Sequence, residues 1–527
     1  MLTFVSFLAF TAFVAFYAWY KLRKDNLSSQ DGYFLGGRSL PGVVIAGSML
    51  LTNISTEHLI GLNGSAYKNG FPVIAWEVTS AIALIVAALY FVPRYLKMGL
   101  TTIPQYLEYR YDGLTRTIVA LFLILSFIFT LLPIVLFTGA INLESIFNIS
   151  EVLGVSRAEG LWITVVLIGV IGSIYAIFGG LKAVAYSDTI NGYGLLLGGL
   201  LVPILALVQI GDGNPLDGLL KVYHFAPAKF NVIGAPDSVM PFEVLFTGLI
   251  INQLYFWCMH QTIIQRALGA KNLIEAQKGL LLTGVLKILI PIIIMLPGVI
   301  GFYYFGDSLY DMQDSVYPEL VKRVLPVGLL GFFAAVVMGA VLSTFNSVLN
   351  SAATIFSVGI YKRHLKKNAT EQTLVRVGKI TSSILAGFAI MVAPFVANAP
   401  EGLYQLLQVL NGIFFIPVAS IILAGFFLPR VSAAGAKSAI FVGLAFYVTT
   451  TFILKVNIHF IHIWGIEFIL NLIVMFVVSY FYPVKRTFNI ADVQVVDMHH
   501  WKYAKPMGLS LIAITILIYI LLGQAGR

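Results

Sequence analysis

Three residues that can take part in binding stand close together inside an apolar stretch near 72–93, namely Trp76, Glu77 and Ser80. Glu77 and Ser80 are three positions apart, so a helix would place them on one face. Lys287 lies inside another apolar stretch and offers a counter-charge to Glu77. A neutral sugar needs paired hydrogen-bond donors and acceptors for its hydroxyls and aromatic rings for its apolar faces. The set therefore favours a sugar site, with a purely structural Glu77–Lys287 ion pair as the alternative.

Small and hydroxylated residues follow one another in the apolar stretch near 325–360. Ala340 and Ser343 share a helix face, Thr344 comes next, and Asn346 and Ser347 follow directly. Hydroxyls beside the free carbonyls of a broken helix form an uncharged oxygen cage, which suits a hard monovalent cation. Close packing of helices through small residues is the alternative interpretation.

Polar residues interrupt two apolar stretches that lie five stretches apart along the chain. The first interruption is 52–58 within 40–62, and the second consists of 252–253 and 260–261 within 242–263. Matching interruptions in two halves of five helices point to an inverted-repeat transporter, in which broken helices expose backbone carbonyls at the middle of the bilayer. The alternative is that these polar residues only join helices to one another.

The composition excludes a soluble fold. The chain has 527 residues, of which 59% are hydrophobic and only 11% are charged, whereas soluble domains carry about 25% charged residues. Stretches of about 20 apolar residues recur along the whole sequence, and each is long enough to cross a bilayer. We expect an all-α integral membrane protein with about fourteen transmembrane helices, near 2–20, 40–62, 72–93, 117–143, 160–178, 189–209, 242–263, 280–304, 325–360, 378–397, 402–428, 436–454, 460–481 and 507–523.

The basic residues predict the orientation of these helices. Lys and Arg gather in alternate links, beginning with the link after the first helix, so the positive-inside rule places both termini outside. The net charge of +9 is distributed over short links rather than over a soluble face, so we expect no nucleic-acid partner. A plasma membrane is the expected location, and the inner membrane of a bacterium fits best.

Enzymatic chemistry lacks its usual residues in this sequence. There is no phosphate-binding G-x-x-x-x-G-K-[ST] string and no zinc-binding H-E-x-x-H string. We find no pair of nucleophile and base, and Cys258 is the sole cysteine. The sequence therefore favours a transporter over an enzyme.

With three further strings, these residues resemble the sodium:solute symporter family, and in particular its sodium/glucose and sodium/galactose cotransporter branch. The strings are DGYFLGGR at 31–38, GGLKAVAYSD at 179–188 and QRALGAKN at 265–272. The resemblance implies a LeuT-type core of two inverted five-helix repeats, with one extra helix before it and three after it. It places an N-terminal helix and link at 1–30, the transport core at 31–430 and three C-terminal helices at 431–527.

The resemblance also implies where sodium binds. The ligands would be the carbonyls of Leu51, Ile54 and Ala340 and the hydroxyls of Ser343 and Thr344. A second sodium site, or a residue set for sodium exit, is expected at Asp188, Asn346 and Ser347.

For the sugar, the resemblance implies a contact set beside Trp76, made of Asn53, His58, Glu77, Ser80 and Lys287, with Trp257 next to the inner gate. The chain departs from the family at four places. Phe256 stands where the inner-gate tyrosine is expected, and Leu131 stands in place of an amide. Gln253 stands in place of an asparagine. Gln408 matches the family's glutamine only loosely, because it is one residue out of register. These departures concern which sugar is bound.

We therefore expect a symporter that imports sodium with a small polyhydroxylated solute, most simply a sugar, by alternating access. A proton-coupled carrier of the same fold, with Glu77 or Asp188 as the proton carrier, is one alternative. A substrate-gated sensor that depolarises the membrane without moving solute is another. Uptake that depends on sodium, and accumulation of solute, would distinguish the three.

Overall fold

The computed structural model describes residues 2–23, 27–398, 402–484 and 488–526, and the elements it names over this part of the chain are all helices. The first half of the chain forms α1 (Leu2–Leu22), α2 (Gln30–Phe34), η1 (Gly36–Arg38), α3 (Gly42–Asn53), η2 (His58–Leu62), α4 (Asn63–Asn69), η3 (Phe71–Ile74), α5 (Ala75–Val78), α6 (Ser80–Val86), η4 (Ala87–Phe91), α7 (Val92–Lys97), α8 (Ile103–Arg110), α9 (Gly113–Ser126), η5 (Phe127–Leu131), α10 (Leu132–Phe147), α11 (Ile149–Leu153), α12 (Arg157–Ile210) and α13 (Pro215–Phe225). The second half forms η6 (Pro227–Phe230), η7 (Phe242–Phe246), α14 (Gly248–Cys258), α15 (Gln261–Leu268), α16 (Leu273–Phe305), η8 (Tyr310–Ser315), α17 (Val316–Val324), α18 (Val327–Thr354), η9 (Ile355–Leu365), α19 (Glu371–Val392), η10 (Ala393–Asn398), α20 (Leu403–Phe427), α21 (Ala433–Val448), η11 (Thr449–Ile453), α22 (Phe460–Phe481) and α23 (Ala504–Leu522).

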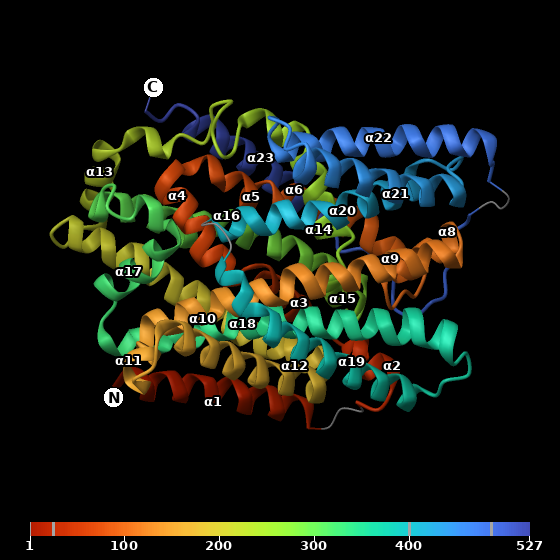
Figure 1. The fold of residues 1–527 in the computed structure, drawn as a ribbon, viewed down its shortest axis with the longest axis horizontal. Helices are drawn as coiled ribbons and strands as arrows, with labels where there is room; N and C mark the ends of the chain where they lie inside the picture. The colour runs from red at the N-terminus through yellow and green to blue at the C-terminus, as the bar shows by residue number, and fades with distance from the viewer. Residues whose placement is uncertain (1, 24–26, 399–401, 485–487, 527) are drawn as a thin grey trace.

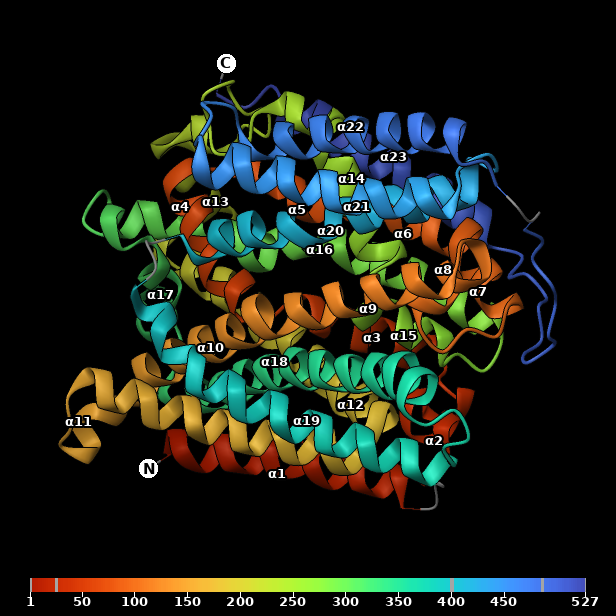
Figure 2. The same ribbon diagram turned by 45° about the vertical axis from the view of Figure 1, so that its right-hand side comes forward.

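The long helices run side by side along one axis, as Figures 1 and 2 show. The short helices α11, α13 and α17 gather at one end of this bundle, whereas α2, α8 and α15 gather at the other. Helix α1 begins and helix α23 ends at the same end, beside α11 and α13 (Figure 1). A chain with both ends on one side of a bilayer crosses it an even number of times, as the fourteen expected helices require.

The described helices give up to thirteen candidate membrane spans, one fewer than the fourteen expected. Twelve of the described helices are long and apolar enough to cross a membrane. The stretch 40–62 forms Gly42–Asn53 and His58–Asn69, which are bent by 66° at the break. The stretch 242–263 forms α14 and α15, separated at Met259–His260, so residues 252–253 lie inside α14 and only 260–261 lie at the interruption.

One predicted link is much shorter than expected. Helix α12 consists of two membrane-spanning helices, Arg157–Ile177 and Gly179–Ile210, which meet at a kink at Gly180, where φ is +58°. The kink frees carbonyls from the helix, and the Tyr33 hydroxyl donates to the carbonyls of Ala176 and Ile177 at 3.0 Å each. Asp188 therefore lies within a membrane span rather than in a link.

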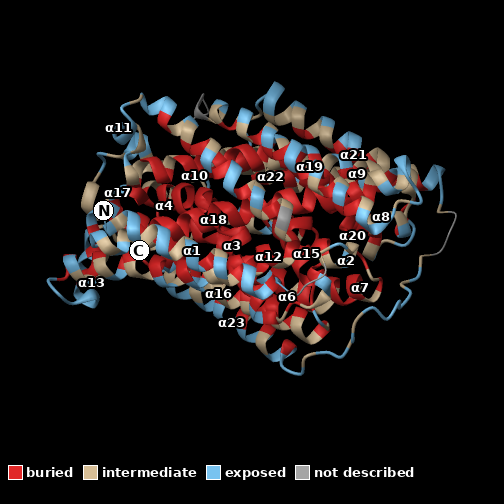
Figure 3. Ribbon diagram, turned by 90° about the horizontal axis from the view of Figure 1, so that it is seen from below, coloured by how far each residue is buried: buried red, intermediate tan, exposed pale blue. Residues whose placement is uncertain are grey.

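Burial separates inner helices from outer ones. In the most apolar window of Phe71–Lys97, 72% of residues are buried, and the figure for Val327–Leu365 is 67%. The windows of α1 and α23 are only 11% and 17% buried, and Figure 3 shows the buried residues concentrated around α3 and α18. Because exposed apolar side chains face lipid in a membrane protein, α1 and α23 belong to the lipid-facing layer. The division of the chain at residues 30 and 430 stays a prediction.

The three strings that carry the family resemblance meet at the end of the bundle that holds α2 and α15. Gln265 donates to the Phe34 carbonyl at 2.7 Å, and Arg38 donates to the Leu268 carbonyl at 3.1 Å. Tyr33 contacts the kink of α12, as described above. The strings therefore hold α2, α12 and α15 together. This fixes the position of α15, the second half of the span that is broken at Met259–His260.

Candidate substrate and sodium sites

A central cavity of about 70 Å³ lies where the first break meets α14 and α20. Every predicted substrate residue except Lys287 lines it, and so do both predicted gate residues. These are Asn53, His58, Trp76, Glu77, Ser80, Gln253, Gln408, Phe256 and Trp257. Residues far apart in the sequence are thus brought to one small space in the protein interior.

Lys287 reaches the cavity through two of its lining residues. Its ammonium group donates to Asn53 Oδ1 at 2.5 Å and forms an ion pair with Glu77 Oε2. Lys287 and Glu77 are 0% and 1% exposed, and charges so thoroughly removed from water are tolerated only when they are paired. The other carboxylate oxygen, Glu77 Oε1, has His58 Nε2 at 3.8 Å, beyond a direct hydrogen bond. Glu77 therefore retains an acceptor oxygen for a ligand.

Gln253 and Ser80 are largely occupied with each other. Ser80 lies within hydrogen-bond reach of Gln253 Oε1 at 3.1 Å, and the Gln253 amide donates to the Trp76 carbonyl at 2.8 Å and to Thr79 Oγ1 at 3.0 Å. These contacts join α14 to α5 and α6. Gln253 consequently acts first as a brace between helices, which its sequence position did not reveal.

Aromatic rings form the cavity walls. The Tyr404 ring packs edge-on against His58 at 5.0 Å and against Trp76 at 5.6 Å. On the opposite side, Phe256 stacks on His260 with ring centroids 5.2 Å apart and packs edge-on against Trp257. The phenylalanine at the gate keeps the stacking surface of a tyrosine, but it brings no hydroxyl into the cavity.

Sequence reasoning missed several residues that line the cavity. Tyr404 is one, and Gln408 donates to its hydroxyl at 2.7 Å. The four-residue spacing of Tyr404 and Gln408 was a usable signal, because it places both side chains on one helix face. The other lining residues that were not predicted as ligands include Glu57, Ser126, Asn252, Asn411 and Phe415.

Two of the predicted sodium ligands, Leu51 and Ile54, lie at the break after α3, and a third, Thr344, contacts the backbone there. The chain leaves helical geometry at Ile54, with φ −90° and ψ 93°. Apart from bonds within a helix, no backbone amide of the described residues donates to the carbonyls of Leu51 and Ile54. Thr344 donates to the Thr52 carbonyl at 3.0 Å, and the Thr52 and Ser347 hydroxyls are 3.1 Å apart. Helix α18 is thereby held directly against the broken backbone.

The remaining predicted sodium ligands are also buried. Ala340 is 0% exposed and Ser343 is 2% exposed. The Ser343 hydroxyl faces the Asp188 carboxylate without reaching good hydrogen-bond geometry to any residue in the described ranges. Free carbonyls, hydroxyls and a nearby carboxylate are the hard oxygen donors that an alkali cation takes, so the donor set fits sodium.

The expected second site contains a cation, the Arg266 guanidinium, that the sequence did not indicate. Asp188 Oδ2 accepts hydrogen bonds from Ser48 Oγ at 2.6 Å and from Arg266 at 3.4 Å, and the Arg266 guanidinium also donates to the Ser347 hydroxyl. Arg266 is 0% exposed. Asn346 instead lines a different small cavity together with Ser343. The guanidinium thus lies between Asp188 and Ser347.

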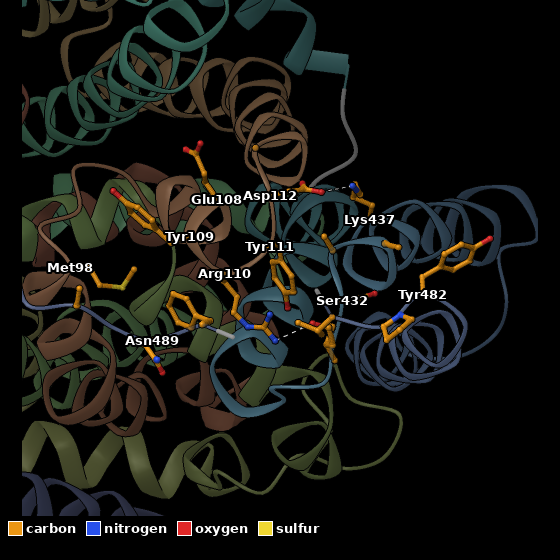
Figure 4. A pocket seen from close by; sticks show the side chains of 18 of the residues that line it. Met98, Glu108, Tyr109, Arg110, Tyr111, Asp112, Ser432, Lys437, Tyr482 and Asn489 are labelled. Carbon is orange, nitrogen blue, oxygen red and sulfur yellow. Dashed lines mark hydrogen bonds and ion pairs between the residues drawn. The ribbon is translucent and has the colours of Figure 1, made fainter. Parts of the chain in front are cut away.

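A wider cavity of about 920 Å³ opens at the end of the bundle near α8 (Figure 4). Its walls carry Tyr109, Arg110, Asp112 and Lys437, and it holds none of the predicted substrate or sodium residues. Its size alone does not make it the transport site, since it lies away from both broken spans.

Two broken spans around a buried polar cavity define a LeuT-type secondary transporter. The chain belongs to the sodium:solute symporter family, whose sequence model matches residues 33–443. It is therefore a multi-pass membrane transporter that couples solute movement to sodium, and its family consists of carriers rather than enzymes.

Individual relatives agree with this assignment. The chain is 45% identical to the uncharacterized symporter YidK of Escherichia coli strain K12, over 96% of this chain and 88% of that protein. It is 32% identical to the sodium/glucose cotransporter of Vibrio parahaemolyticus, over 80% of each chain. Its fold matches that of a Na⁺-coupled sialic acid symporter with a TM-score of 0.76 and 21% identity, over 92% of this chain and 99% of the other. The expected fold class is confirmed.

Proposed function

We propose that this symporter imports a sugar or a closely related polyol together with sodium. The observation that carries the proposal is the Lys287–Glu77–Asn53 set, which presents charged and amide groups to a cavity walled by aromatic rings. A sugar offers alternating hydroxyl donors and acceptors along its edge and apolar C–H groups on its faces. The similarity to a protein named for sodium and glucose supports the same solute class.

In this proposal the sugar edge binds along α3, η2, α5 and α6. A sugar hydroxyl donates to the free oxygen of Glu77, and another lies between His58 and Asn53. Ser80 contributes an acceptor oxygen, and the ring face lies against Trp76 or Phe256. Hydrogen bonds to charged groups contribute about 1.5 to 3 kcal/mol each, so Glu77 is the dominant contact.

Sodium binding would organise this site because the two sets share one segment of backbone. The proposed ligands are the carbonyls of Leu51, Ile54 and Ala340 and the hydroxyls of Ser343 and Thr344. Asn53, which accepts from Lys287, stands between the first two of these carbonyls. A sodium ion that joins the break to α18 therefore also fixes Asn53 for the solute.

The sodium gradient is large enough to accumulate solute. One charge gains about 2.3 kcal/mol per 100 mV of membrane potential, and a tenfold concentration ratio adds about 1.4 kcal/mol. One sodium ion per solute thus sustains a solute gradient of roughly 500-fold. Phe256 and Trp257 form the inner gate, which the solute passes after the carrier opens inward.

We assign Asp188, Asn346 and Ser347 to the exit of sodium rather than to a second binding site. The Arg266 guanidinium between Asp188 and Ser347 would repel a second sodium ion, which supports this assignment. The predicted orientation, with both termini outside the plasma membrane, puts α15 and Arg266 toward the inner side.

Uptake by the purified protein in liposomes tests the proposal. Hexoses, pentoses, inositols and sialic acids are offered with an inward gradient of sodium, potassium or protons. We expect one polyhydroxylated class to accumulate with sodium only, and current without accumulation would identify a sensor instead. Ser343→Ala should raise the sodium concentration for half-maximal uptake about tenfold or more, the loss of about 1.5 kcal/mol of ligand interaction.

The matched control is Ser383→Ala, whose hydroxyl only donates to the Lys379 carbonyl on the same helix. It should behave as the wild type. If Ser343→Ala keeps the wild-type dependence on sodium, the proposed cage is wrong even where sugar uptake is observed.

A further inference from the structure

A second cavity at the α8 end of the bundle has a basic lining. It measures about 790 Å³, and its walls include Arg94, Arg110 and Arg430 together with Asn489. No aspartate or glutamate is among its lining residues. Three guanidinium groups without a carboxylate form a site for an anion, because arginine binds phosphate and carboxylate groups through paired N–H donors.

Two of the three arginines have donors to spare. Arg430 is exposed and makes no hydrogen bond or ion pair with the described part of the chain. Arg94 uses one nitrogen to donate to the Tyr90 carbonyl at 2.8 Å, and its guanidinium lies over the Tyr90 ring at 3.5 Å. That stacking holds the guanidinium plane in place while its other N–H groups stay available.

Arg110 has a different role in the wall. It donates to the carbonyls of Gly425, Leu428, Pro429 and Val431, and so closes the end of α20. Arg110 and Asn489, both labelled in Figure 4, belong to the wall that this basic cavity shares with the wider cavity next to it. Arg110 therefore shapes the site and adds positive charge, whereas Arg94 and Arg430 supply the free donors.

In the neighbouring wider cavity, the acidic side chains are paired with basic side chains of the protein. There, Lys437 donates to Asp112 at 2.6 Å, and Glu108 pairs with both Arg116 and Arg363. Its carboxylates and Lys437 are thus paired with protein partners, and its remaining positive charge is that of Arg110 on the shared wall. The excess of positive charge is thus confined to the basic cavity of Arg94 and Arg430.

The basic cavity opens at the level where membrane spans end. Arg94 is in the last turns of the span Phe71–Lys97, and Phe427 is the final residue of α20. The Phe427 ring is 54% exposed and stacks on Tyr90 at 5.0 Å, with an angle of 16° between the rings. Exposed aromatic rings beside basic groups are typical of the boundary between acyl chains and headgroups.

We propose that this cavity binds the phosphate headgroup of an anionic phospholipid. Arg94 and Arg430 hold the phosphate oxygens, and the acyl chains extend along Tyr90 and Phe427. The predicted orientation places the site in the inner leaflet, where basic pockets between helices select anionic headgroups. The bound lipid connects α7 to the link between α20 and α21.

Native mass spectrometry of the full-length protein tests the proposal. Phosphatidylglycerol or phosphatidylcholine is added to the detergent-solubilised protein, and the fraction of protein that retains each lipid is measured. We expect phosphatidylglycerol to be retained preferentially, and Arg94→Gln and Arg430→Gln each to weaken its binding about fivefold. Replacement of both residues by lysine should restore part of the preference, because the charge remains and the paired donors are lost.

The matched control is Arg157→Gln, an exposed arginine at the opposite end of the bundle, which should leave lipid retention unchanged. Equal retention of the two lipids by the wild type, or an effect of Arg157→Gln as large as that of Arg94→Gln, would overturn the proposal. Complete displacement of phosphatidylglycerol by millimolar inorganic phosphate would also overturn it, because the site would then serve free phosphate.

Discussion

Two buried ion pairs in the described part of the chain, Lys287–Glu77 and Arg266–Asp188, have nearly the same burial and very different surroundings. All four side chains are at most 1% exposed. The Arg266 guanidinium donates to Ser48, Thr262, Ser347 and Asp188, so protein atoms use the donors on each of its three nitrogens. Within the described residues, Lys287 donates hydrogen bonds to Asn53 and Glu77 alone, and both of those residues face the central cavity.

This difference indicates what each pair does. A buried pair whose groups are fully bonded by the protein holds elements together, and here it joins α3, α12, α15 and α18. A buried pair that keeps an unused carboxylate oxygen next to a cavity can use that oxygen to accept a hydrogen bond from a ligand. The Arg266–Asp188 pair thus joins helices, and we call it the latch. The Lys287–Glu77 pair forms part of a binding site.

The largest effect should come from breaking the latch. Arg266→Met leaves the Asp188 carboxylate buried without a counter-charge, which costs about 3 to 5 kcal/mol of folding free energy. We expect a marked fall in the melting temperature of the detergent-solubilised protein and little correctly folded carrier. The double variant Arg266→Met with Asp188→Leu should recover much of that loss. If the single variant melts like the wild type, the latch assignment is wrong.

The next effect concerns the cavity pair. Glu77→Gln keeps the shape of the side chain but removes the charged acceptor, so the affinity for solute should fall about 10- to 100-fold, the value of a charge-assisted hydrogen bond. It also leaves the buried Lys287 ammonium without a counter-charge, so the melting temperature should fall as well. The Michaelis constant for solute reports the change in affinity, and the sodium concentration for half-maximal uptake should stay close to the wild-type value. A change in melting temperature as large as that of Arg266→Met, with solute affinity unchanged, would make Glu77 a structural residue.

A smaller effect sharpens the description of the cavity wall. Phe256→Tyr adds the hydroxyl that the gate lacks, and one new neutral hydrogen bond of about 1 kcal/mol should lower the Michaelis constant about fivefold. Phe256→Leu removes the stacking surface and should raise it. Equal constants for the two variants would show that the ring does not contact the solute.

The smallest effect should come from a partly exposed pair, Asp112 with Lys437, which serves as a reference for the two buried ones. Burial by itself raises the pKa of Asp112, but hydrogen bonds from Lys437 and Thr115 outweigh it and lower the pKa below the usual value. The stability that this provides is present above about pH 4, the pKa of the unfolded chain, and is lost as the pH falls through the lowered value. Solvent screening keeps it under about 1 kcal/mol.

Asp112→Asn should therefore flatten the pH dependence of unfolding between pH 5 and pH 3 by a small amount, relative to the wild type. Thermal unfolding at the two pH values measures it. An effect at pH 7 as large as that of Arg266→Met would contradict the ranking of buried and exposed pairs.

Local sequence determined much of this protein, because apolar length and polar interruptions act on their own segment. The twelve long apolar helices, the break after Asn53 and the shared face of Glu77 and Ser80 all follow from residues close together in the chain. The family strings then indicated which distant residues belong to one site, and the structure gathers them around one cavity.

Tertiary structure alone decided which of these polar groups are free. Arg266 reaches Asp188 across 78 residues of sequence, and Gln253 braces the helix that carries Trp76, which lies 177 residues away. The two helices of α12 meet at Gly180, and the distant Tyr33 supplies hydrogen bonds to the carbonyls that are freed there. Spacing along a helix fixes which side chains share a face, but hydrogen-bond capacity is consumed by partners that only the packed fold brings within reach.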